Sequence, residues 1–139
     1  MTLPESDILA ARILIVDDQP MNIELAKFVL DADGMAVDSA ADAGQAMRAI
    51  AACRPDLVLM DIQMPDIDGL ALARSLKRDP ATRAIVVVAF TAYAMKGDEA
   101  KMRAAGCDGY IAKPIQVASF AATVRALLDA GVVTAQTST

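Results

Sequence analysis

The chain has 139 residues and a mass of 14.6 kDa, which is the size of one domain with a single core. Its net charge of −5 argues against nucleic acid or an anionic membrane surface as the main partner. The chain contains no histidine, which excludes triads that need an imidazole, histidine-ligated zinc and a phosphohistidine on this chain. Any chemistry here must use carboxylates, hydroxyls, lysine or a metal.

The cysteines and the N-terminus indicate the compartment. Cys53 and Cys107 form no CxxC motif, and we expect both to be small buried residues in a reducing compartment. The first ten residues carry a proline and two acids where a signal peptide would have an apolar core. The longest apolar run, residues 84–90, is too short to cross a bilayer. We therefore expect a cytoplasmic protein.

Five short apolar runs predict five strands, in chain order at residues 13–16, 35–37, 57–60, 84–90 and 110–112. Unbroken apolar runs are typical of strands buried on both faces of a parallel sheet. The segments between the runs have helical periodicity, as in Ile23, Ala26 and Leu30. This alternation predicts an α/β fold: a single doubly wound (βα)5 domain whose central parallel five-stranded sheet has the order 2-1-3-4-5, with helices on both faces.

The same pattern predicts the domain boundaries. One domain accounts for residues 11–130, and residues 1–10 form a short N-terminal arm. Residues 131–139 end in Thr and Ser, and we expect a frayed C-terminal tail there.

Polar residues follow four of the five runs. Asp17 and Asp18 follow the first, Asp61 the third, Thr91 the fourth and Lys113 the fifth. Because parallel strands end at one edge of the sheet, these side chains should converge there. Each also has a simpler explanation when taken alone: Asp18 or Thr91 could cap a helix, and Lys113 could be a solvated surface lysine.

The three acids together point to a metal. Carboxylates crowded at one edge repel one another unless a cation neutralises them, and oxygen ligands favour Mg²⁺ (or Mn²⁺). An aspartate beside such an ion can act as a nucleophile and form an aspartyl-phosphate. Lys113 and Thr91 would then offset the charge on the phosphoryl oxygens.

Three segments resemble the receiver domains of two-component response regulators, the CheY-like superfamily. They are residues 13–22 (ILIVDDQPMN), 55–69 (PDLVLMDIQMPDIDG) and 90–115 (FTAYAMKGDEAKMRAAGCDGYIAKPI). The resemblance extends over residues 11–130. The last segment is most similar to single-domain regulators of the DivK type and to the receivers of hybrid histidine kinases.

The resemblance implies which residues carry out the reaction. Asp61 would accept the phosphoryl group. Asp17 and Asp18 would hold Mg²⁺ together with Asp61 and the backbone carbonyl of Gln63.

The resemblance also implies a phosphoryl-binding and switch set made of Thr91, Ala92, Lys113 and Tyr110. Thr91 would move toward the phosphate, and Tyr110 would turn inward as it does so.

Three further positions are carried over in the same way. The Lys113–Pro114 peptide would be cis, as is usual in the family. Gln63 and Tyr93 would flank the attacking water and so tune the rate of dephosphorylation.

The function implied is that of a single-domain response regulator in a two-component system or phosphorelay. A histidine kinase or a histidine phosphotransfer protein would donate the phosphoryl group. The output would reach a downstream protein through the face made by the fourth helix, the fifth strand and the fifth helix, or the phosphate would be passed on to another protein. The resemblance implies a phosphoacceptor switch rather than an enzyme, with no nucleic-acid or membrane partner.

Other functions remain open to different degrees. An interaction module that works without phosphorylation is one alternative, because retained residues show capacity rather than use. An aspartyl-phosphate phosphatase or phosphotransferase is another, but relatives of the haloacid dehalogenases have a DxD motif where this chain has Asp17-Asp18. A nucleotide or flavin binder is disfavoured, because residues 17–20 contain no phosphate-binding glycine.

Overall fold

The structure is a computed structural model, and it describes residues 11–62, 69–91, 96–113 and 115–137. Several positions with predicted roles lie outside the described residues: Gln63, Ala92, Tyr93, Pro114 and the arm at residues 1–10. Their roles stay predictions.

Strands and helices alternate along the described chain. The elements are β1 (Arg12–Val16), α2 (Pro20–Ala32), β2 (Ala36–Ala40), α3 (Ala43–Ala52), β3 (Leu57–Asp61), α4 (Gly69–Arg78), β4 (Val86–Thr91), α5 (Lys96–Ala104), β5 (Gly109–Ala112) and α6 (Val117–Thr137). The strands form one sheet of order β2-β1-β3-β4-β5, and every neighbouring pair is parallel. The predicted fold class and strand order are confirmed.

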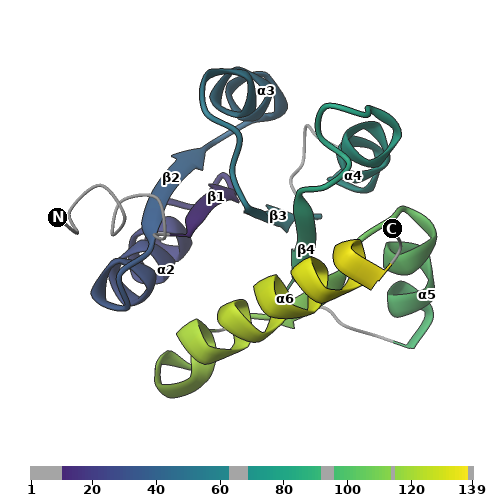
Figure 1. Ribbon diagram of the computed structural model, residues 1–139. Helices are drawn as coiled ribbons and strands as arrows, with labels where there is room; N and C mark the ends of the chain where they lie inside the picture. The colour runs from purple at the N-terminus through teal and green to yellow at the C-terminus, as the bar shows by residue number, and fades with distance from the viewer. Residues whose placement is uncertain (1–10, 63–68, 92–95, 114, 138–139) are drawn as a thin grey trace, which may run out of the picture.

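Different helices cover the two faces of the sheet: α3 and α4 lie on one side, and α2 and α6 on the other (Figure 1). Successive residues of a strand point to opposite faces, so a strand buried on both sides contributes to two cores. In β3, Val58 packs in the core with α3, α4 and α5, whereas Leu59 packs in the core with α2 and α6. This two-sided burial explains the unbroken apolar runs.

Two predicted strand boundaries differ from the structure by more than one residue. β2 extends to Ala40, past the predicted end at residue 37, because an edge strand exposes polar side chains such as Asp38 and Ser39 that break the apolar run. β4 begins at Val86 rather than residue 84. The N–H of Ile85 donates to the carbonyl of Thr82 at 3.0 Å, so Ile85 is buried but belongs to the preceding turn.

The expectation that both cysteines are buried is wrong for Cys53. Cys107 is buried, but Cys53 is exposed. Cys53 is the C-cap of α3 and has extended backbone angles, so it lies beyond the last helical turn that packs on the sheet.

The last helix continues through residues 131–137, which the sequence assigned to a tail. These residues include no proline that would stop a helix. Among the helices that the structure describes, none is both long and apolar enough to span a membrane.

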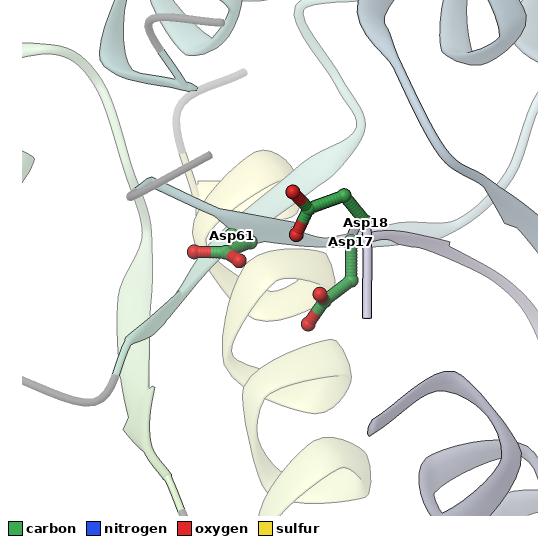
Figure 2. Close-up of side chains that lie close together, drawn as sticks. All are labelled: Asp17, Asp18 and Asp61. Carbon is green, nitrogen blue, oxygen red and sulfur yellow. The ribbon is translucent and has the colours of Figure 1, made fainter. Parts of the chain in front are cut away.

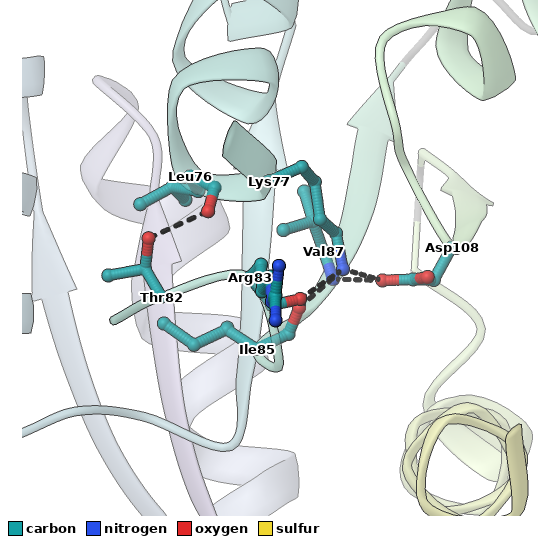
Figure 3. Close-up of polar contacts among 7 residues, drawn as sticks. All are labelled: Leu76, Lys77, Thr82, Arg83, Ile85, Val87 and Asp108. Carbon is teal, nitrogen blue, oxygen red and sulfur yellow. Dashed lines mark hydrogen bonds and ion pairs between the residues drawn. The ribbon is translucent and has the colours of Figure 1, made fainter. Parts of the chain in front are cut away.

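A charged side chain ties three elements together at the N-terminal edge of the sheet (Figure 3). The Lys77 ammonium, from α4, donates to the carbonyls of Ile85 (2.7 Å) and Arg83 (3.2 Å) and to the carboxylate of Asp108 (2.7 Å). The same Asp108 oxygen accepts from the N–H of Val87 at 2.8 Å. Lys77 therefore fixes the end of α4 against the starts of β4 and β5, at the edge opposite the predicted site.

Candidate functional site

Three carboxylates meet at the C-terminal edge of the sheet (Figure 2). One oxygen from each of Asp17, Asp18 and Asp61 lies within 4.8 Å of the other two. Asp17 and Asp18 follow β1, Asp61 ends β3, and these two strands pair in parallel. Asp17 and Asp61 are buried, whereas Asp18 is exposed. The structure thus brings together the three acids that the sequence singled out.

Lys113 reaches the acids from the end of β5. Its ammonium lies 2.9 Å from Oδ2 of Asp17 and 3.2 Å from Oδ2 of Asp61. The lysine side chain is largely buried, so solvent screens these ion pairs weakly. Lys113 is therefore no solvated surface lysine. One ammonium among three carboxylates leaves an excess of negative charge that attracts a cation.

The loop after β1 holds Asp17 in place. Oδ1 of Asp17 accepts from the N–H of Gln19 at 2.8 Å, which leaves Oδ2 for Lys113. The N-cap of α2 is Gln19, with no side-chain cap hydrogen bond. Asp18 is therefore not the helix cap that the sequence left open, and its carboxylate lies beside the other two acids.

Thr91 and Tyr110, the two predicted switch residues, differ in their exposure to solvent. Thr91 is the last residue of β4 and is fully buried, and its carbonyl accepts from the N–H of Lys113 at 2.7 Å. Tyr110 lies on β5 with 39% of its surface exposed. It borders a groove of about 430 Å³ between β5 and the first turns of α6, which Lys113 and Phe120 also line.

Gly69 lets α4 begin directly against the strand that carries Asp61. A Cβ at this position would lie 2.7 Å from the carbonyl oxygen of Asp61 and 2.7 Å from the Cα of Ile62. Real side chains do not approach backbone this closely, so the packing requires glycine.

The sequence reading missed one residue at this edge. The ammonium of Lys113 lies 4.8 Å from the centre of the Phe90 ring. Phe90 ends an apolar run and looks like any core aromatic, so only its pairing with Asp61 across β3 and β4 could have singled it out.

The donor set suits a hard divalent cation. All three side chains offer carboxylate oxygens, the kind of ligand that Mg²⁺ prefers. One oxygen from each lies within 4.8 Å of the other two, so small side-chain adjustments would let the three share one ion. The residues present therefore fit the metal that the sequence predicted.

Comparison with known proteins identifies the family. The family model described as the response regulator receiver domain matches residues 13–125, most of the chain. The chain belongs to this family.

Individual proteins that are similar to this receiver domain support the same family assignment. The polar-differentiation response regulator DivK of Brucella anthropi is 40% identical over 116 residues, which cover 84% of this chain and 94% of that protein. The receiver domain of a signal transduction histidine kinase from Syntrophus aciditrophicus is 35% identical, with a TM-score of 0.77 over 87% of this chain and 92% of that one. The chemotaxis protein CheY4 of Vibrio cholerae, at 21% identity and a TM-score of 0.80 over 85% of this chain and 98% of that one, supports the fold alone.

Proposed function

We propose that this receiver domain is a phosphorylation switch in a two-component system or phosphorelay, with Asp61 as the phosphoacceptor. The observation that supports this most strongly is the position of Asp61. Its carboxylate lies beside two further acids and 3.2 Å from the Lys113 ammonium, at the edge of the sheet where α/β folds bind ligands.

The donor in this proposal is a phosphohistidine on a histidine kinase or a histidine phosphotransfer protein. It must belong to another protein, because this chain has no histidine of its own. An oxygen of Asp61 attacks the phosphorus and a P–O bond forms. The P–N bond breaks, and the imidazole keeps the electron pair and takes up a proton. The product is an aspartyl-phosphate.

Asp17, Asp18, Asp61 and the carbonyl of Gln63 are the residues that would hold Mg²⁺ (or Mn²⁺). When bound, the ion supplies positive charge next to the phosphoryl oxygens. Asp17 is fixed by the hydrogen bond that its Oδ1 accepts from Gln19, so its Oδ2, which contacts Lys113, is already oriented toward the site.

Lys113, Thr91 and the backbone at Ala92 bind the phosphoryl oxygens in this proposal. The Lys113 ammonium contacts Asp61 directly, and Thr91 lies at the end of the strand next to β3. A preoriented cation and donors aimed at developing negative charge lower the barrier to transfer.

Phosphorylation then changes the surface formed by α5, β5 and α6. Thr91 and Lys113 are joined through the backbone, and Tyr110 lies on the same short strand with a groove beside it. An inward turn of Tyr110 would alter this groove and so control a protein partner in the cytoplasm, or the phosphate would be relayed onward. Gln63 and Tyr93 would set the lifetime of the phosphorylated state, and the Lys113–Pro114 peptide would be cis.

The first test is the intact mass of the protein after incubation with acetyl phosphate, with Mg²⁺ or with a chelator. We expect one added phosphoryl group with Mg²⁺ and none with the chelator. Asp61→Asn should add none, whereas Asp129→Asn, which changes an exposed carboxylate on α6, should react like the wild type.

Two outcomes would favour the alternatives. If no mass is added even from phosphohistidine donors, although Mg²⁺ binds, the domain is an interaction module that works without phosphorylation. If the protein hydrolyses an aryl phosphate over many turnovers, it is a phosphatase rather than a switch.

A further inference from the structure

The ring of Phe90 lies against the ammonium of Lys113, 4.8 Å from nitrogen to ring centre. A cation this close to an aromatic ring is attracted by the negative charge of the ring face. Phe90 is fully buried and the Lys113 side chain is largely buried. The attraction is stronger in such a site than at an exposed one, because water does not compete for the ammonium.

The register of the sheet explains why Phe90 lies there. Phe90 on β4 pairs with Asp61 on β3, and paired residues of parallel strands point to the same face. Phe120 of α6 packs against the same ring, with centroids 6.3 Å apart and planes at 29°. Phe90 therefore contacts both the lysine that pairs with Asp61 and the first turn of α6.

We infer that Phe90 is a positioning residue, whose ring keeps the Lys113 ammonium over Asp61 for phosphoryl transfer. This inference rests on the proposed function, in which Lys113 binds the phosphoryl oxygens. The carboxylates of Asp17 and Asp61 also hold Lys113, but they are the groups that a bound cation would engage. The ring carries no charge and does not bind Mg²⁺, so its attraction for the ammonium persists when the acids are engaged.

A role in core packing alone would also require an aromatic residue at this position, so the test must change the ring's electrons and keep its shape. Replacing Phe90 by 4-fluoro-, 3,5-difluoro- and 3,4,5-trifluorophenylalanine withdraws electrons from the ring face in steps. The rate of phosphorylation by acetyl phosphate with Mg²⁺ is measured for each protein.

We expect the logarithm of the rate to fall in even steps, to a total loss of about tenfold, with the melting temperature little changed. The same series at Phe28, which is 72% exposed on α2, should leave the rate unchanged. Equal rates across the Phe90 series would overturn the inference, because packing alone does not depend on the charge of the ring face.

A second measurement needs neither Mg²⁺ nor phosphate. A double-mutant cycle of Phe90→Leu and Lys113→Met is measured by urea unfolding in the presence of a chelator. We expect the two changes to be coupled by a factor of about three or more in the unfolding equilibrium constant. Strictly additive effects would show that the ring does not hold the lysine. This cycle separates the two proposals, because it retains its meaning if the wild type proves unable to accept a phosphoryl group.

Discussion

At the scale of single residues, Cys107 has a strongly altered ionisation. The pKa of its thiol is raised from the usual 9.0 to about 11, mainly by burial and to a smaller extent by the neighbouring Asp108 carboxylate, while Lys77 opposes both. The thiol therefore keeps its proton at neutral pH and packs as a small apolar group.

This raised pKa makes stability depend on alkaline pH. The unfolded chain releases the Cys107 proton near pH 9 and the folded protein only near pH 11, so the contribution to stability is complete below pH 9 and is lost as the pH rises toward 11. We expect the free energy of unfolding to fall more steeply over this window in the wild type than in Cys107→Ala. Urea unfolding at several pH values measures the difference, and parallel curves would contradict it.

At the scale of elements, α4 is fixed to the sheet at both of its ends. Gly69 packs its first turn against the end of β3, and Lys77 ties its last turn to the starts of β4 and β5. The position of Asp61 therefore depends on α4, although this helix contributes none of the three carboxylates of the site.

Gly69→Ala tests this dependence. The new Cβ would clash with backbone at Asp61 and Ile62, so we expect a loss of about 1–3 kcal/mol in the free energy of unfolding and slower phosphorylation of Asp61. Gly44→Ala is the matched control on α3, where the nearest atoms belong to the side chains of Asp42 and Arg48, and it should change stability by less than about 1 kcal/mol. Equal effects of the two substitutions, measured by urea unfolding, would show that the close approach at Gly69 is unimportant.

At the scale of the whole molecule, charge is distributed differently at the two edges of the sheet. At the C-terminal edge, Lys113 faces three carboxylates, two of them buried. At the N-terminal edge, Lys77 faces one carboxylate and two carbonyls. Lys113 thus acts as an internal counter-ion that a divalent cation can assist or replace.

Lys113→Met should therefore destabilise the protein in a way that Mg²⁺ reverses. With a chelator we expect a loss of about 3 kcal/mol, because the buried carboxylates lose their partner. Mg²⁺ should raise the melting temperature more in this variant than in the wild type. Lys77→Met is the control: it should lose about 1–2 kcal/mol and gain no more from Mg²⁺ than the wild type does. A similar gain from Mg²⁺ in both variants would mean that the ion does not bind at the acids.

Much of the fold could be predicted because burial on both faces leaves a direct mark on the sequence. The runs that became β1, β3 and β4 are unbroken, and right-handed crossovers then restrict the strand order. The edge strand β2 was predicted too short, since Asp38 and Ser39 are exposed and interrupt the apolar pattern. Cys53 was assigned to the core because its exposure depends on where α3 ends, which periodicity does not show.

The sequence by itself determined the parallel sheet, its order and the meeting of Asp17, Asp18 and Asp61, because strands running in one direction must end at one edge. Only the tertiary structure decided which side chains touch there. The contact of Lys113 with Phe90 and the approach of Gly69 to Asp61 join residues on different elements. Such contacts depend on strand register and helix packing, which distances along the chain do not specify.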